Sequence, residues 1–68
     1  MTNIIIGNEQ MRVNASRVSE LLPALDLPSE GRGIAIAVND SIVSRSRWQE
    51  HELRDGDRIE IVRAVQGG

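Results

Sequence analysis

The side chains that could carry chemistry are few in this sequence and lie apart from one another. His51 stands between Glu50 and Glu52, whereas a metal site or an acid–base pair would need a second histidine or a convergent carboxylate cluster. We therefore expect His51 to belong to a surface loop, and we predict no metal site. None of the serines lies in a Gly-x-Ser-x-Gly motif, so no Ser-His-Asp triad is expected. The serines fall instead at predicted caps, turns and polar edges: Ser16, Ser19, Ser29, Ser41, Ser44 and Ser46.

Two glycine-containing motifs resemble ligand-binding loops without meeting their requirements. Asp55-Gly56-Asp57 matches part of a calcium loop but lacks the later glutamate ligand at the right spacing, so we interpret it as a turn. Gly31-Arg32-Gly33 is too short for a phosphate-binding loop and precedes a predicted strand, whereas a phosphate loop precedes a helix. We interpret it as a connector. Neither motif predicts a bound cofactor.

The composition argues against a self-contained enzyme. The 68 residues include no cysteine, which excludes an internal disulfide, a thiolate zinc site and a cysteine nucleophile. All 8 basic residues are arginine, so a P-loop lysine, a Schiff-base lysine and a side-chain amine for isopeptide self-linkage are excluded too. A chain this short also leaves little room for an enclosed catalytic cavity. We therefore expect a protein that is not an enzyme.

Charge and hydropathy narrow the range of partners. Ten acidic residues and 8 arginines give a formal net charge of −2, and the two signs alternate along the chain, so no nucleic-acid partner is expected. The longest apolar runs fall far short of the ~20 residues that a membrane span requires. Residues 1–4 lack the basic and apolar regions of a secretion signal. These features favour a cytoplasmic protein without a membrane partner.

The first half of the sequence predicts a hairpin and then a helix. The segments 4–6 and 9–13 flank Gly7-Asn8, which is typical of a type II′ turn, so we predict a hairpin at roughly 3–14. The helix is predicted from an apolar stripe with the spacing i, i+3, i+4, i+7. The residues of this stripe are Val18, Leu21, Leu22 and Leu25.

Capping residues and prolines set the expected limits of that helix. Ser16 is predicted as its N-cap, and Glu20 in the first turn suits the positive end of the helix dipole. Pro23 conflicts with the apolar stripe, because an interior proline costs about 3 kcal/mol and removes a backbone hydrogen bond. We expect the helix to kink or stop near Leu22, and Pro28 to end any helical structure.

The second half of the sequence predicts three strands and a polar connector. Residues 34–38 alternate large and small apolar side chains, as in a strand covered by a helix on one face. Asn39-Asp40 is predicted to turn the chain into a strand at 41–43, and alternation returns in a final strand at 58–65. Between these strands we expect Trp48 to anchor the polar connector on the core rather than to bind a partner.

This order of elements predicts an α+β fold of the β-grasp type. A mixed sheet of four to five strands would be covered by one main helix. The domain is expected to span residues 1–65, followed by a flexible tail at 66–68. Because the core is small, truncating one of its large aliphatic residues would cost roughly 2–5 kcal/mol. The predicted core residues are Val18, Leu21, Leu22, Ile36, Ile59 and Ile61.

The sequence ends in Gly67-Gly68, directly after the last predicted strand. Two residues without a Cβ form a thin, freely bending thread that can enter a channel too narrow for side chains. The carboxylate of Gly68 is unreactive until it is joined to a leaving group, which adenylation by ATP provides. The alternative is a frayed terminus without a function, and the β-grasp layout favours the functional interpretation.

Two segments of the second half resemble the ThiS family of sulfur carrier proteins of thiamine biosynthesis. Residues 37–48 (AVNDSIVSRSRW) follow the family pattern A-[LV]-N-x-x-[IV]-V-x-R-x-x-W. Residues 53–68 (LRDGDRIEIVRAVQGG) follow the pattern L-x-[DE]-G-D-x-[IV]-E-[IV]-V-x-A-V-x-G-G. The length, the first hairpin and the V-x-E-L-L segment that begins at Val18 agree as well, and Pro23 is the main departure.

The resemblance implies a ubiquitin-like fold whose terminal residue carries sulfur. An E1-like adenylyltransferase (ThiF-like) would use Mg-ATP to form an acyl-adenylate on Gly68. Sulfur from a cysteine desulfurase or a rhodanese-type donor would then replace AMP. A thiazole synthase (ThiG-like) would take the sulfur from the resulting thiocarboxylate. Gly67 would let the thread enter both active sites, and the carrier itself would bind no cofactor.

Apolar residues near the end of the chain are expected to dock those enzymes. The residues that could form one patch lie on or just after the final predicted strand and are Val62, Ala64 and Val65. We expect the chain to be a monomer when no partner is bound.

Three alternative functions stay open. A small subunit of molybdopterin synthase typically has the ending aliphatic-Pro-Pro-Val-x-Gly-Gly, which residues 62–68 lack. A ubiquitin-like protein modifier would form isopeptide adducts, and a binding module with an inert tail would tolerate a C-terminal extension.

Overall fold

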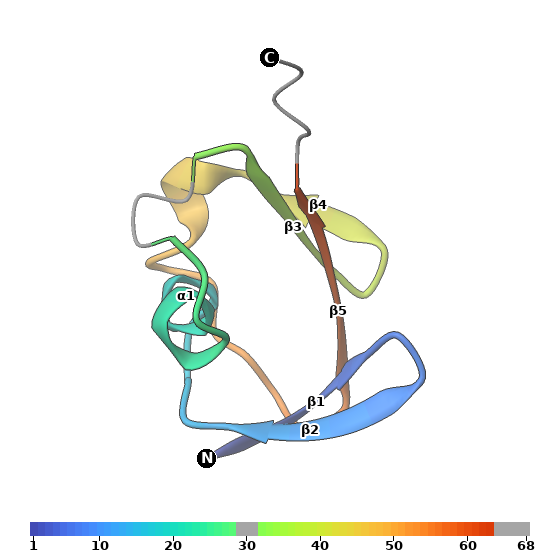
Figure 1. Cartoon of the computed structure of the whole chain (residues 1–68). Helices are drawn as coiled ribbons and strands as arrows, with labels where there is room; N and C mark the ends of the chain where they lie inside the picture. Colours follow the sequence, from blue (N-terminus) through green and yellow to red (C-terminus); the bar gives the residue numbers. More distant parts are fainter. Residues whose placement is uncertain (29–31, 64–68) are drawn as a thin grey trace.

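Five strands form one mixed sheet, and a short helical segment covers one of its faces (Figure 1). The computed structural model describes residues 1–28 and 32–63 of the chain. The strand order is β2-β1-β5-β3-β4, with β1 and β5 parallel and the other neighbours antiparallel, which confirms the predicted β-grasp layout. The strands are β1 (Thr2–Ile6), β2 (Glu9–Val13), β3 (Ile34–Val38), β4 (Ser41–Val43) and β5 (Asp57–Arg63), and a 3₁₀ turn at Arg45–Arg47 follows β4.

Two tight turns connect the antiparallel pairs that are adjacent in sequence. Between β1 and β2, Gly7 has a φ of +63°, the positive value that the predicted type II′ turn requires at its first central residue. Between β3 and β4, Asn39 and Asp40 both adopt left-handed conformations, with φ values of +52° and +70°. Both predicted turns are therefore confirmed.

The helical segment is shorter than its apolar stripe predicts. A 3₁₀ turn at Val18–Glu20 leads into α1, Leu21–Ala24. The prediction that Ser16 is the N-cap is wrong, because Arg17 occupies that position with an extended backbone. Instead, Oε1 of Glu20 reaches back and accepts hydrogen bonds from the Ser16 N–H (2.6 Å) and the Ser16 hydroxyl (2.9 Å). These donors, the N–H first, lower the pKa of the Glu20 carboxyl below its ordinary value of 4.5.

The helix α1 ends in a Schellman motif. The N–H of Leu27 donates to the carbonyl of Leu22 (2.7 Å), and the N–H of Asp26 donates to the carbonyl of Pro23 (3.2 Å). Asp26 is left-handed, with a φ of +59°, at the position that glycine usually fills. Pro23 lies in the first turn of α1, where a backbone N–H needs no partner within the helix. The helix therefore continues past Leu22 and ends at Ala24.

The core lies between the helical segment and the inner face of the sheet. Ile36 on β3, Ile59 on β5, and Val18 and Leu21 in the helical segment are each at most 1% exposed. Five of the six predicted core residues are buried, whereas Ile61 is only partly buried against the core. The apolar side chains on the inner face of β5 are therefore less completely buried towards the end of the strand.

Main-chain hydrogen bonds fix the connector between β4 and β5 to the start of the helical segment. The N–H of Val18 donates to the carbonyl of His51, and the N–H of Ser19 donates to the carbonyl of Trp48, both at 2.9 Å. The Trp48 side chain is 5% exposed, and its Nε1 donates to the carbonyl of Val43 at 2.9 Å. The predicted anchoring role of Trp48 is confirmed.

Replacing Asp26 by glycine should stabilise the chain. Glycine adopts the left-handed conformation without the Cβ clash that costs other residues roughly 1 kcal/mol. We expect Asp26→Gly to raise the free energy of unfolding, measured with urea, by about 0.5–1 kcal/mol. Ala24→Gly is the matched control within α1 and should lower it by about 0.5–1 kcal/mol. A less stable Asp26→Gly chain would contradict the role assigned to this residue.

Candidate functional site

The main chain of His51 helps to fix the connector to the helical segment. The residue is half-buried, its backbone N–H donates to the carbonyl of Arg47 at 2.9 Å, and its backbone carbonyl accepts the N–H of Val18. Within residues 1–28 and 32–63, no group of three or more histidine or acidic residues is placed to hold a metal ion. The same part of the chain contains no helix that is long and apolar enough to cross a membrane.

The Asp55-Gly56-Asp57 motif is a turn, as predicted, and it fixes the start of β5. Oδ2 of Asp57 accepts the N–H of Arg54 at 2.8 Å. Oδ1 of Asp55 accepts the N–H of Asn3 on β1, and the Gly56 N–H donates to the carbonyl of Asn3, both at 2.8 Å. Both carboxylates are therefore occupied by backbone donors, and the turn is fastened to β1.

Asn39 fixes the start of β5 from the opposite side. Its Nδ2 donates to Oδ1 of Asp57 at 3.0 Å, and its Oδ1 accepts the N–H of Arg58 at 3.0 Å. Its main-chain N–H also donates to the carbonyl of Arg58, at 2.8 Å. The β3–β4 turn is thereby linked to β5 through both backbone and side chain. The start of the strand that leads to the Gly-Gly ending is held from two sides.

The far end of β5 carries an exposed apolar surface on the outer face of the sheet, away from the helical segment. Val62 is 54% exposed and pairs with Ala35 of β3. Ile42 of β4 is 76% exposed and pairs with Ala37 of β3, and cross-strand partners point to the same face of a sheet. Alternation along β3 places both alanines on this face. We name Ala35, Ala37, Ile42 and Val62 the outer patch.

Of the residues predicted to carry or dock near the end of the chain, the structure describes Val62. Val62 is exposed, as its predicted docking role requires. Outside the described residues lie Ala64, Val65, Gly67 and Gly68, together with the predicted boundary between the domain and the tail.

The neighbours of Val62 in the outer patch were not predicted. The alternation of residues 34–38 indicated that the alanines share one face, and Ile42 stood in a predicted strand. Their proximity to Val62 depends on the β3–β5 and β3–β4 registers. Register is set by pairing across the whole sheet, so a local sequence pattern does not determine it.

One known family accounts for nearly the whole chain. The sequence model described as "ThiS family" matches residues 4–68, which include both the turn that starts β5 and the Gly-Gly ending. The chain belongs to the ThiS family. It is therefore a sulfur carrier protein of thiamine biosynthesis with a ubiquitin-like β-grasp fold, a carrier rather than a catalyst.

Individual relatives match nearly the whole of this chain. The sulfur carrier protein ThiS of Escherichia coli (strain K12) is 36% identical over 66 residues, which cover 96% of this chain and 97% of that protein. A thiazole synthase of Paramagnetospirillum magneticum is 32% identical over 65 residues, which cover 96% of this chain but 20% of that protein. The crystal structure of a thiamine biosynthesis protein (ThiS) from Geobacter metallireducens has the same fold, with a TM-score of 0.79 at 23% identity, covering 98% of this chain and 100% of that one.

Asn39→Gly should separate the hydrogen bonds of the side chain from the strain of its backbone. Glycine accepts the left-handed φ but loses the bonds to Asp57 and Arg58, so we expect the free energy of unfolding to fall by about 1–2 kcal/mol. Asp40→Gly, at the next left-handed position, is the matched control and should leave stability unchanged or raise it by up to about 1 kcal/mol. Equal stabilities for the two variants, measured by urea unfolding, would refute the importance of the Asn39 side chain.

Proposed function

We propose that the carboxylate of Gly68 is the group that carries sulfur. The observation that supports this proposal is that the ThiS family model matches residues 4–68, a range that includes the Gly-Gly ending. Gly67 and Gly68 have no side chain to obstruct a narrow channel, so the end of the chain can reach an enclosed active site on a partner. The sequence contains no cysteine, and no thiol of the carrier would therefore compete for the sulfur.

The first step activates the carboxylate on a partner enzyme. An oxygen of the Gly68 carboxylate attacks the α-phosphorus of Mg-ATP in an E1-like adenylyltransferase (ThiF-like), forming an acyl-adenylate and releasing pyrophosphate. The partner binds the nucleotide and the metal ion, so the carrier supplies only the nucleophile and needs no cofactor of its own.

The second step replaces AMP by sulfur. The terminal sulfur of a protein persulfide, loaded by a cysteine desulfurase or a rhodanese-type donor, attacks the carbonyl carbon of Gly68, and AMP leaves. A thiol then attacks the donor's own sulfur in the resulting acyl disulfide. The products are a thiocarboxylate on Gly68 and a disulfide on the donor.

The thiocarboxylate sulfur is then transferred to a thiazole synthase (ThiG-like). In Paramagnetospirillum magneticum, a segment similar to nearly all of this chain makes up 20% of a protein named thiazole synthase. Two activities in one polypeptide keep their sites at high effective concentration, which suits a carrier and the enzyme that it supplies. This relative supports a thiazole synthase as the sulfur acceptor of the present chain.

The outer patch is the proposed docking surface for these enzymes. Val62 and Ile42 are among the large apolar side chains most exposed in the described parts of the chain, and they lie on one face of the sheet, Val62 near the end of β5. Burying such side chains in an interface is favourable. Docking at this patch would bring the last residues of the chain to the partner that must react with them, with Ala64 and Val65 extending the contact.

Intact-mass spectrometry tests the carrier function directly. After incubation with Mg-ATP, an E1-like adenylyltransferase and a persulfide donor, the chain should gain the mass difference between sulfur and oxygen, located at Gly68 by fragmentation. Gly68→Ala should fold normally but yield at most about a tenth of that product, because the added methyl group misplaces the reacting carbonyl. Full thiocarboxylation of Gly68→Ala would refute the proposal.

A remote variant and a search for adducts complete this experiment. Arg12→Ala, at an exposed position on β2, should be thiocarboxylated as fully as the natural chain. Isopeptide adducts on other proteins, in place of the thiocarboxylate, would assign the chain to the protein modifiers instead.

Val62→Asp tests the docking role of the outer patch. A charge at this half-exposed position should change the free energy of unfolding by less than about 0.5 kcal/mol. The same charge would be buried against an apolar partner, so affinity for the adenylyltransferase, measured by calorimetry, should fall at least about tenfold. The control is Gln10→Asp on β2, two strands from β5 in the sheet, which should bind with little change. Unchanged affinity for Val62→Asp would exclude the outer patch as the docking surface.

A further inference from the structure

The central strand of the sheet loses its neighbour on one side halfway along its length. β5 pairs with β3 from Ile59 to Arg63, along almost all of its extent. Its pairing with β1 ends where Ile6 lies opposite Ile59, and β1 itself ends at Ile6. The second half of β5 is therefore an edge on the β1 side, as far as the described part of the chain extends.

Main-chain polar groups of β5 point into this open edge. The N–H and the carbonyl of Arg58 both bond to Asn39, on the β3 side of the strand. Successive residues of a strand direct these groups to alternate sides, so those of Ile61 and Arg63 point to the β1 side. No residue of β1 lies opposite them, and within residues 1–28 and 32–63 no hydrogen bond from the turn at Gly7 reaches them.

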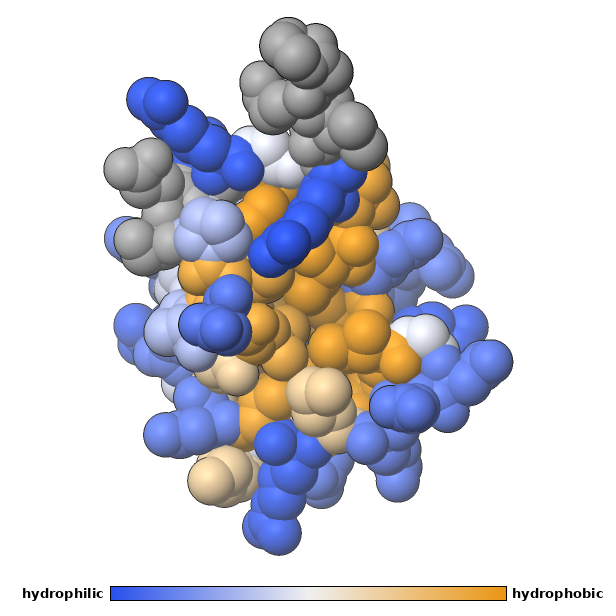
Figure 2. All heavy atoms as spheres, viewed as in Figure 1, coloured by the Kyte–Doolittle hydropathy of each residue, from blue (hydrophilic) through white to orange (hydrophobic). Residues whose placement is uncertain are grey.

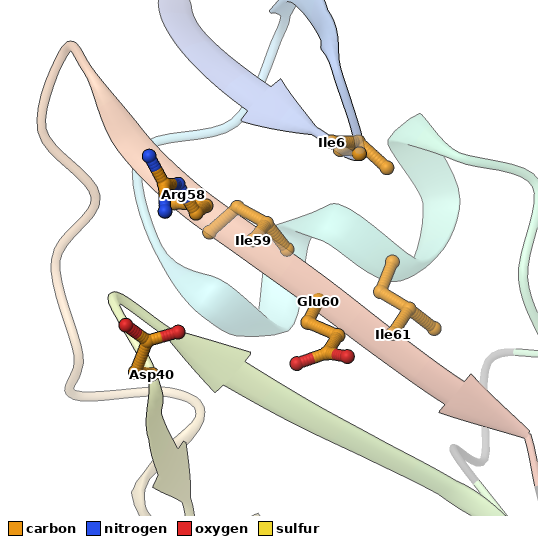
Figure 3. Close-up of a pocket in the computed structure, with 7 residues that line it drawn as sticks. Ile6, Asp40, Arg58, Ile59, Glu60 and Ile61 are labelled. Carbon is orange, nitrogen blue, oxygen red and sulfur yellow. The ribbon is translucent and has the colours of Figure 1, made fainter.

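A groove lined by both apolar and charged residues lies at the same edge. A pocket of about 390 Å³ is bounded by Ile6 and Gly7 at the end of β1 and by Ile59 and Ile61 of β5. Figure 3 shows Ile6 on one side of β5, with Asp40 and Glu60 on the other. Apolar side chains also reach the surface between α1 and β5 (Figure 2). Partly buried apolar residues packed against the core are Ile6, Leu25, Leu27, Ile34 and Ile61.

We propose that this edge binds an extended segment of the E1-like adenylyltransferase, which pairs with β5 as an added strand. This inference rests on the proposed function, since that enzyme must hold the carrier while it activates Gly68. The added strand would continue the position of β1 beyond Ile6 and hydrogen bond to the N–H and carbonyl groups of Ile61 and Arg63. Strand addition of this kind uses main-chain bonds for affinity and neighbouring side chains for specificity.

The side chains along the edge specify the chemistry of the added segment. Inside the groove, the neighbour of Ile61 should be apolar, because it would cover the partly buried end of the core. Glu60 and Arg58 of β5 line the pocket, and Asp40 lines it from the β3 side. A basic side chain beside Glu60 would pair with its carboxylate. The expected occupant therefore alternates an apolar residue with a lysine or an arginine.

The direction of β5 favours an activating enzyme as the occupant. The open half of β5, from Glu60 to Arg63, directly precedes residues 64–68 in the sequence. A strand bound here would give residues 64–68, which end in the reacting Gly68, a fixed starting point, and fixing a reactant in this way lowers the entropic barrier to its reaction.

Hydrogen exchange measured by NMR, residue by residue, tests strand addition. In the free chain, the amide of Ile61 should exchange at least about tenfold faster than that of Val62, which faces β3. Saturating adenylyltransferase should slow exchange at Ile61 and Arg63 by about tenfold or more and change Val62 little. An Ile61 amide that stays unprotected in the complex would overturn the proposal. If protection of the Ile61 amide rises with the concentration of the chain in the absence of the enzyme, the edge binds a second copy of the chain. That result would also overturn the proposal.

Two pairs of variants separate main-chain from side-chain contributions. Arg63→Pro removes an N–H that faces the open edge, whereas Arg63→Ala keeps it, so affinity for the enzyme should be about tenfold lower for the proline variant than for the alanine variant. Glu60→Lys should weaken binding about tenfold, and Glu50→Lys, at an exposed position in the connector, should not. Equal affinities within either pair would contradict the inference.

Thiocarboxylation measured in the same samples distinguishes the two proposals. A chain that gains sulfur at Gly68 while Ile61 stays unprotected keeps its proposed function and refutes strand addition. A chain that shows protection at Ile61 but gains no sulfur refutes the proposed function and leaves the edge as a binding surface.

Discussion

The parallel pairing of β5 with β1 is the interaction on which the rest of the molecule depends. β1 and β2 form one hairpin, and β3, β4 and β5 form a separate antiparallel unit. Within residues 1–28 and 32–63, only the β1–β5 ladder joins them into one sheet. It also brings Ile4 and Ile59 together beneath the helical segment, where both are at most 1% exposed. Each half of the sheet alone would leave its apolar face uncovered, and a two-stranded hairpin is at best marginally stable in water.

Because the ladder is short, its register is fixed by polar groups at its beginning. The turn before β5 is fastened to β1 through Asn3, and the turn after β3 is fastened to β5 through Asn39. These bonds are made by aspartate and asparagine side chains. From the sequence alone, a motif such as Asp55-Gly56-Asp57 could also suggest a metal site. With the register set at one end, β5 runs beyond β1 with β3 as its one neighbouring strand in the described part of the chain, which leaves an edge on the β1 side.

Much of this fold follows from local sequence patterns, and the exceptions have physical causes. Both tight turns, the alternating strands and the anchoring of Trp48 depend on neighbouring residues and could be predicted. The cap at Ser16 could not, because the carboxylate of Glu20 competes for the same backbone groups and binds them from the other direction. The length of the helix depends on how Pro23 is placed within a turn. The surroundings of Val62 and the open edge at Ile61 arise from strand register, which no local pattern contains.

The position of Trp48 has an optical consequence. It is the single aromatic residue of a sequence without tyrosine or phenylalanine, so near-ultraviolet absorption and intrinsic fluorescence come from this one indole. Its ring nitrogen is bound to the carbonyl of Val43, and the guanidinium of Arg45 lies over the ring, 5.9 Å from its centre. The emission spectrum of the protein is therefore a built-in reporter of one event, the release of the β4–β5 connector from the core, and needs no attached dye.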